Sequence, residues 1–135
     1  MTATPVRPLD RSVTVARAVL FHYTCADAAP LIDAELLLRP NRHPALPEPL
    51  VWLTDLDTCW REELGLTSHH LTCDRGAHRF TVADPAGCEP WSAYARRVLP
   101  PALRRALENH TTRLRPRHWW VSLAPVPVLP RRERP

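Results

Sequence analysis

The sequence predicts a single α+β domain with a mostly antiparallel or mixed (split) sheet and short helices. Three observations predict this class. The length of 135 residues fits one domain, and an apolar fraction of 44% is sufficient for one core. Strand-like runs do not alternate strictly with helical patterns, which argues against a doubly wound parallel sheet. We expect the domain to span residues 15–129, between a flexible leader at 1–14 and a basic tail at 130–135.

The first strand and the first helix are predicted near the start of this domain. Residues 15–24 are apolar and partly β-branched, which favours a buried strand. Asp27 is expected to cap a helix over residues 27–36 through its carboxylate. Pro30 falls in the first turn of that helix, where a missing amide hydrogen is tolerated.

A short extended piece, a loop and a second strand follow. Residues 36–40 end at a proline and are expected to be extended. Four prolines lie within 40–49, and proline at this density predicts a loop. The apolar run at 50–54 predicts the second strand. A short helix is expected over residues 57–63, with Gly65 as its left-handed C-terminal residue.

The second half of the chain is expected to contain more strands and two helices. Residues 78–83 alternate in polarity and predict a third strand, and the Asp-Pro-Ala-Gly sequence at 84–87 predicts a turn. Two helices are expected at 90–98 and 102–109, separated by a pair of prolines. Residues 117–128 predict two final extended pieces, the second of them at a sheet edge because of its prolines.

The composition limits the cellular setting. All 18 basic residues are arginine, against 14 acidic residues, and the formal net charge is +4. This bias has two open explanations, a GC-rich coding sequence or selection for guanidinium groups. No apolar run approaches the roughly 20 residues that cross a bilayer. The N-terminus does not resemble a signal peptide. We therefore expect a cytoplasmic protein that makes no membrane contact.

The cysteines and histidines do not predict a metal site. The four cysteines are widely and irregularly spaced, without a Cys-x-x-Cys pair, so a zinc ribbon or a thioredoxin-type site is excluded. His69, His70, Cys73 and His78 provide only one half of a structural zinc site. We expect free thiols, as is usual in a reducing cytosol, and no bound metal.

The two predicted strands at 15–24 and 50–54 end in groups that suit a nucleotide. The first ends in His22, Tyr23 and Thr24, and the second contains Trp52 and Thr54. A ring nitrogen, a phenol and hydroxyls match the ribose hydroxyls and the flat heterocycle of a nucleotide. The alternative is a strand whose polar tip simply meets solvent. If the nucleotide interpretation holds, both strands should lie in one sheet, with His22 and Trp52 near a shared cleft.

The same residues resemble a known signature. His-Tyr-Thr at the end of an apolar strand, followed by a short helix and the exit Leu38-Arg39-Pro40, resembles the first-strand region of the ADP-ribosyltransferase-like superfamily. The resemblance covers about the first half of the chain, and it implies NAD as cofactor. It further implies that His22 and Thr24 hold ribose and that Tyr23 or Trp52 faces the nicotinamide. Thr54 and Arg39 join them as expected cofactor-binding residues.

The chain departs from this superfamily at the catalytic acid. Members that transfer ADP-ribose usually carry a late glutamate, but the expected late strand at 119–122 contains no acid. Glu89 is the best replacement and Glu108 lies mid-helix, so we expect Glu89 and His22 to be the catalytic residues. The RNA 2′-phosphotransferase branch relies on histidine and arginine instead, and a degenerate, non-catalytic member is a further alternative. The arginines that could bind phosphate in that branch are Arg39, Arg75 and Arg79.

Two classes of function follow. The first is an NAD-dependent mono-ADP-ribosyltransferase or a related 2′-phosphotransferase-like enzyme that modifies a macromolecule, nucleic acid being favoured over protein by the arginine-rich C-terminal half. The second is a small basic protein that binds nucleic acid or a partner without catalysis. The five tryptophans are interpreted mainly as core residues, although with neighbouring arginines they could stack on single-stranded bases. A further polar cluster at 64–75 is open to a structural or a functional interpretation.

Overall fold

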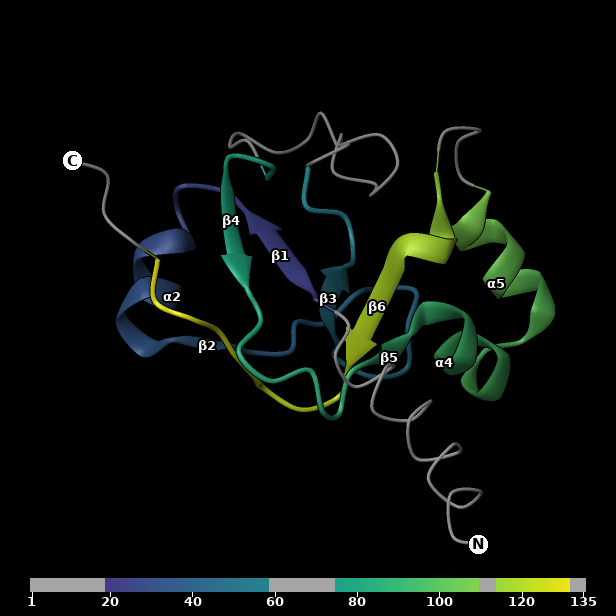
Figure 1. The fold of residues 1–135 in the computed structure, drawn as a ribbon. Coiled ribbons are helices and arrows are strands. Elements are labelled where there is room, and N and C mark those ends of the chain that lie inside the picture. The colour runs from purple at the N-terminus through teal and green to yellow at the C-terminus, as the bar shows by residue number, and fades with distance from the viewer. Residues whose placement is uncertain (1–18, 59–74, 110–113, 132–135) are drawn as a thin grey trace, which may run out of the picture.

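The computed structural model describes residues 19–58, 75–109 and 114–131 of the chain (Figure 1). Their main feature is a five-stranded sheet with the order β4-β1-β3-β6-β5, in which all neighbouring strands are antiparallel. A separate two-stranded sheet pairs β2 with β7. The predicted α+β class with an antiparallel sheet is therefore confirmed. The strands are β1 (Phe21–Thr24), β2 (Leu37–Leu38), β3 (Val51–Thr54), β4 (His78–Thr81), β5 (Glu89–Pro90), β6 (Trp119–Ser122) and β7 (Val126–Pro127).

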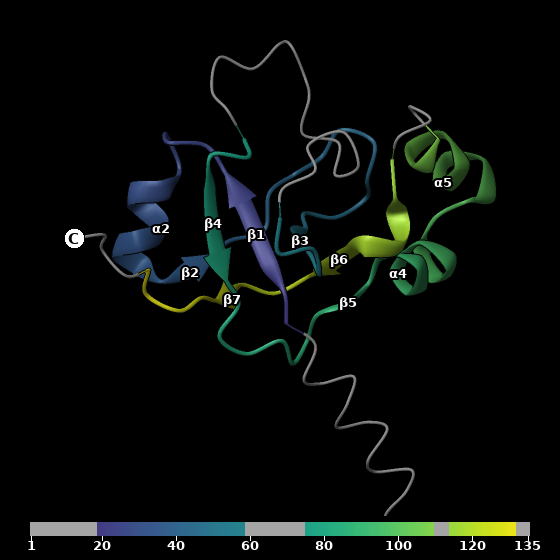
Figure 2. The same cartoon turned by 45° about the horizontal axis from the view of Figure 1, so that its top comes forward.

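The helices flank the two ends of the large sheet. Helix α2 (Ala29–Glu35) lies beside β4, whereas α4 (Trp91–Val98) and α5 (Pro101–Glu108) lie at the end formed by β6 and β5 (Figures 1 and 2). A short 3₁₀ helix, η1 (Pro116–His118), leads directly into β6. The predicted helices at 90–98 and 102–109 correspond to α4 and α5 within one residue at each boundary.

The predicted cap of the first helix is wrong. Helix α2 begins after Ala28, which is its N-cap residue and makes no side-chain capping bond. Asp27 therefore lies one position too early for its carboxylate to cap the first turn. The chain instead enters the helix through a turn in which the Ala29 amide donates to the Cys25 carbonyl at 3.1 Å. Pro30 does occupy the first turn, as predicted.

Leu36 ends α2 and redirects the chain into β2. It adopts a left-handed conformation with φ 55°, which is uncommon for a residue with a side chain and costs on the order of 1 kcal/mol. Two backbone bonds hold it there. Its amide donates to the Ile32 carbonyl at 2.7 Å, and its carbonyl accepts from the Val128 amide at 3.1 Å. The second bond ties this turn to the C-terminal end of β7, the proline-containing strand predicted at a sheet edge.

Two hydrophobic clusters cover the two faces of the large sheet. The first includes Leu53 and packs towards α2 and the small sheet, and the second includes Trp119 and packs towards α4. Successive residues of a strand point to opposite faces of the sheet, so neighbouring residues belong to different clusters. Trp120 packs against the first cluster, and Trp52 packs against the second. The expected placement of Trp119 and Trp120 on opposite faces is confirmed.

The large sheet is divided between β1 and β3. Four residue pairs align β1 with β4, and four align β3 with β6. By contrast, β1 and β3 are aligned only at Phe21 and Thr54. Beyond this pair, β1 is joined to β3 by a side chain: Nδ1 of His22 lies 2.8 Å from the carbonyl oxygen of Trp52. The two strands that carry the predicted nucleotide-binding residues are thus neighbours that separate at His22.

The end of the described chain is fastened to the domain. The Arg131 guanidinium donates to both carboxylate oxygens of Asp33, at 3.0 and 2.6 Å, and to Nδ1 of His78 at 3.0 Å. It also lies 4.2 Å from the centre of the Phe80 ring. Arg131, which belongs to the predicted basic tail at 130–135, is therefore held between α2 and β4.

Several sequence-based expectations fall outside the described residues. They are the leader at 1–14, most of the helix at 57–63, Gly65, most of the polar cluster at 64–75, Cys59, Cys73, His69 and His70. In the parts of the chain that are described, no helix is long and apolar enough to cross a membrane.

Candidate functional site

His22 occupies the point where β1 and β3 separate. A carbonyl oxygen can only accept, so Nδ1 of His22 carries the proton that binds Trp52, and Nε2 presents a lone pair. Burial lowers the pKa of His22 below 6.5, the bond to Trp52 opposes this shift, and the positive charge of Arg75 adds to it. The imidazole is therefore neutral near pH 7 and can accept a hydrogen bond through Nε2.

This lowered pKa makes folding stability depend on pH. Because the unfolded chain binds a proton at His22 more readily than the folded chain does, the free energy of unfolding should fall as the pH drops below 6.5. His22→Gln keeps an amide donor for the Trp52 carbonyl but cannot titrate. Urea unfolding between about pH 5 and 8 should therefore show a shallower acid dependence for His22→Gln than for the wild type. Equal slopes for both proteins would contradict the buried, neutral state of His22.

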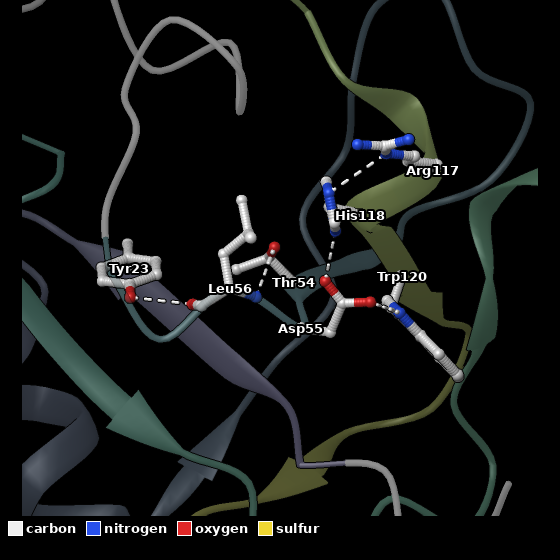
Figure 3. A network of polar contacts seen from close by, with 7 residues as sticks. All are labelled: Tyr23, Thr54, Asp55, Leu56, Arg117, His118 and Trp120. Atoms are coloured by element: carbon white, nitrogen blue, oxygen red, sulfur yellow. Dashed lines mark hydrogen bonds and ion pairs between the residues drawn. The ribbon is translucent and has the colours of Figure 1, made fainter.

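A polar network anchors the turn that follows β3 (Figure 3). The Tyr23 hydroxyl donates to the Leu56 carbonyl at 2.9 Å, and the Leu56 amide donates to the Thr54 hydroxyl at 3.2 Å. Thr54 is buried. Two predicted residues, Tyr23 and Thr54, are thus brought together on either side of this turn. Their hydroxyl groups hold the backbone of this turn in place.

Asp55, the next residue of the turn, organises a second group of side chains. Its Oδ1 atom lies 2.7 Å from Nδ1 of His118, and its Oδ2 atom accepts from the Trp120 indole at 3.4 Å. On the other side of the ring, Nε of Arg117 lies 3.3 Å from Nε2 of His118. In Figure 3 these side chains lie side by side at the start of β6, adjoining the turn after β3.

Sequence reasoning did not find this second group. Asp55 directly follows the predicted strand at 50–54, and His118 directly precedes Trp119 of the last long strand. The two residues meet because β3 and β6 are antiparallel neighbours, with Thr54 opposite Trp119. The sequence offered one signal for this group: Asp55 follows one apolar run and His118 precedes another. The pairing of those runs is what the sequence did not show.

Glu89, the predicted catalytic acid, does not join the other predicted residues. It lies on β5 at the far edge of the sheet, and β6 and β3 separate it from β1. Three strand spacings of about 4.8 Å place β5 roughly 14 Å from β1. Both carboxylate oxygens of Glu89 accept from Arg97 at 2.8 Å, and this hydrogen bonding lowers the pKa of Glu89. Glu89 is therefore an ionised partner of Arg97, and its strand is separated from the strand of His22 by β6 and β3.

The side chains of two other predicted residues, Trp52 and Arg39, make contacts within the protein. The Trp52 ring is 5.1 Å from that of Trp91 and 6.1 Å from that of Trp119, so it packs within the second hydrophobic cluster. Arg39 is exposed at the end of β2 and forms a salt bridge of 3.3 Å with Glu35. Trp52 therefore packs against Trp91 of α4, and Arg39 is paired with Glu35 at the surface.

Thr24 does remain close to His22. The two residues are two positions apart on β1 and therefore project on the same face. Across the sheet, His22 is opposite Phe80 and Thr24 is opposite His78.

Cysteine and metal chemistry find no support in the described residues. Burial, reinforced by the charge of Asp84, raises the pKa of the Cys88 thiol to about 11, so this thiol is a poor nucleophile. Cys25 is buried. Within 19–58, 75–109 and 114–131, no three His, Cys, Asp or Glu side chains gather in a group that could hold a metal ion.

Comparison with known proteins does not place the chain in a family. No family model, no curated protein and no solved structure matches it.

Proposed function

We propose that this protein binds NAD at the junction of β1 and β3 and is an ADP-ribosyltransferase-like enzyme. The observation that carries the proposal is the fixed orientation of His22. Its Nδ1 atom is occupied by the Trp52 carbonyl, and no hydrogen bond joins Nε2 to any described residue, so we assign the lone pair of Nε2 to a ligand hydroxyl. A ribose hydroxyl is a suitable donor to such an acceptor, and this is the role that the His-Tyr-Thr resemblance implies for the histidine.

The surroundings of His22 suit the rest of a dinucleotide. The Thr24 hydroxyl projects on the same face and offers a second contact to ribose. The positive charge of Arg75 is close enough to affect His22, and a guanidinium is a good partner for a pyrophosphate. The proposal gives Trp52 a structural role and assigns no catalytic role to Glu89, because their side chains are engaged within the second cluster and by Arg97.

Calorimetric titration with NAD tests the proposal. The wild-type protein should bind NAD saturably, with one molecule per chain. A titration that stays flat at millimolar NAD, about the weakest affinity of practical use, would contradict it.

A second function, binding of single-stranded nucleic acid, is favoured by the arginines of α4 and α5, because only some of them form salt bridges with glutamates among the described residues. On α4 and α5, Arg97 is paired with Glu89 and Arg104 with Glu108. Arg96 and Arg105 are exposed and form no ion pair with any described residue. Their positive charges are therefore available to phosphates, either of a bound strand or of a nucleic-acid acceptor for ADP-ribose.

Salt dependence measures this second function. Affinity for a labelled single strand should fall with rising salt, and replacing both Arg96 and Arg105 with alanine should reduce the logarithmic slope by about 1.4, at about 0.7 per phosphate contact. The control is Arg97→Ala, whose charge is already balanced by Glu89 and whose loss should change the slope less. Absence of binding near 50 mM salt would exclude this function.

A further inference from the structure

The Asp55–His118 pair has the geometry of a general base and its orienting carboxylate. An ionised Asp55 has no proton to donate and can only accept a hydrogen bond. Nδ1 of His118 therefore carries the proton that is shared with Asp55. Because Arg117 can only donate, Nε2 of His118 presents a lone pair to it. The two contacts together define one tautomer, a neutral imidazole whose basic nitrogen points away from the carboxylate.

The pair is also accessible and rigidly held. The side chains of His118 and Asp55 are 25% and 35% exposed, so a substrate can reach the imidazole. The second oxygen of Asp55 accepts from the Trp120 indole, and the Asp55 amide donates to the His118 carbonyl at 3.3 Å. The carboxylate therefore cannot rotate away without breaking contacts on both sides.

We propose that His118 is the catalytic base of the transfer reaction and that Asp55 is its positioning residue. This inference rests on the proposed function, since it takes NAD as the donor. The connection between the two sites is β3 itself. His22 binds this strand at Trp52, and His118 binds it at Asp55, three residues further on. Three residues of extended chain span about 10 Å, so one dinucleotide can reach both histidines.

The reaction is a substitution at the ribose carbon that carries nicotinamide. The oxygen of an acceptor hydroxyl, or of water, forms a bond to this carbon while the bond to the nicotinamide nitrogen breaks. The electron pair of the broken bond stays on that nitrogen, and nicotinamide leaves as a neutral molecule. The proton of the attacking hydroxyl passes to Nε2 of His118, and the resulting imidazolium is stabilised by Asp55 before it returns the proton to solvent.

Arg117 has a separate part in this scheme. It is exposed and holds Nε2 of His118 through a bond of 3.3 Å, which is long for a charged donor. A phosphate of the donor or of the acceptor is a stronger partner for the guanidinium than a neutral imidazole is. Arrival of that phosphate would draw Arg117 from the imidazole and leave Nε2 open to the attacking hydroxyl.

Release of nicotinamide from NAD, with water as the acceptor, tests the inference without a known acceptor. His118→Gln should reduce turnover at least about 100-fold, the lower limit for loss of a general base. Asp55→Asn should reduce kcat by a similar factor with an unchanged KM for NAD, whereas a merely structural defect would alter both. The matched controls are His43→Gln and Asp27→Asn, which should leave turnover unchanged. Circular dichroism establishes that each variant is folded.

The outcomes separate this inference from the proposed function. If the wild type binds no NAD by calorimetry, the proposed function fails. If it binds NAD and releases nicotinamide, but His118→Gln or Asp55→Asn is as active as the wild type, the acid–base assignment alone is overturned. The assignment of His118 as catalytic base is also overturned if the wild type binds NAD but releases no nicotinamide with either water or single-stranded nucleic acid as the acceptor. A loss in both variants, with NAD affinity and the two controls intact, supports it.

Discussion

Replacing Trp91 with alanine should lower the free energy of unfolding by about 3–5 kcal/mol. Trp91 is fully buried at the start of α4, and its ring lies within 5.9 Å of the rings of Trp52, Tyr94 and Trp119. Alanine would leave a cavity at the centre of the second hydrophobic cluster and remove these aromatic pairs. Urea unfolding followed by circular dichroism measures the change without depending on tryptophan fluorescence.

Part of the expected loss comes from a polar contact. The Trp91 indole donates to Glu108 of α5 at 2.7 Å, and the same carboxylate oxygen accepts from Arg104 at 2.9 Å. Trp91→Phe removes this donor but keeps an aromatic ring, so its effect should be smaller than that of Trp91→Ala. The control is Leu31→Ala at a side chain that is 62% exposed, where the change should be within about 0.5 kcal/mol. A loss of less than about 1 kcal/mol for Trp91→Ala would contradict the central position of this ring.

Local patterns predicted most of the elements, because each depends on residues close in sequence. The apolar run at 50–54 became β3, and the two prolines mark the start of α5, with Pro100 as its N-cap and Pro101 as its first residue. The alternation of Trp119 and Trp120 between two faces also followed from a strand alone. The Asp27 cap failed for a local reason, because the N-cap position falls on Ala28, one residue later.

The candidate site was only partly predictable, because it depends on which strands pair. His22 and Thr54 could be singled out from the ends of apolar runs. Glu89 was chosen as the acid from its place late in the chain, yet β5 pairs with β6 at the edge of the sheet, far from β1. His118 was passed over because its value depends on Asp55, which is 63 residues away and reaches it only through the pairing of β3 with β6.

The second large effect concerns NAD. Replacing His22 with alanine should weaken NAD binding by about 1–3 kcal/mol, or about five- to 150-fold, since a ribose hydroxyl would lose its acceptor. The domain should remain folded, because the four aligned pairs between β1 and β4 do not involve the imidazole. His43→Ala is the matched control. His43 lies in the loop before β3, where its ring accepts from the Ala45 amide, and its loss should leave NAD affinity unchanged.

Calorimetric titration of NAD into the wild type, His22→Ala and His43→Ala, side by side at one pH and one salt concentration, tests the central claim most directly. The account predicts saturable binding to the wild type and to His43→Ala, with the loss of affinity confined to His22→Ala. Equal affinity in all three proteins, or no binding to the wild type, would contradict a nucleotide site at the junction of β1 and β3.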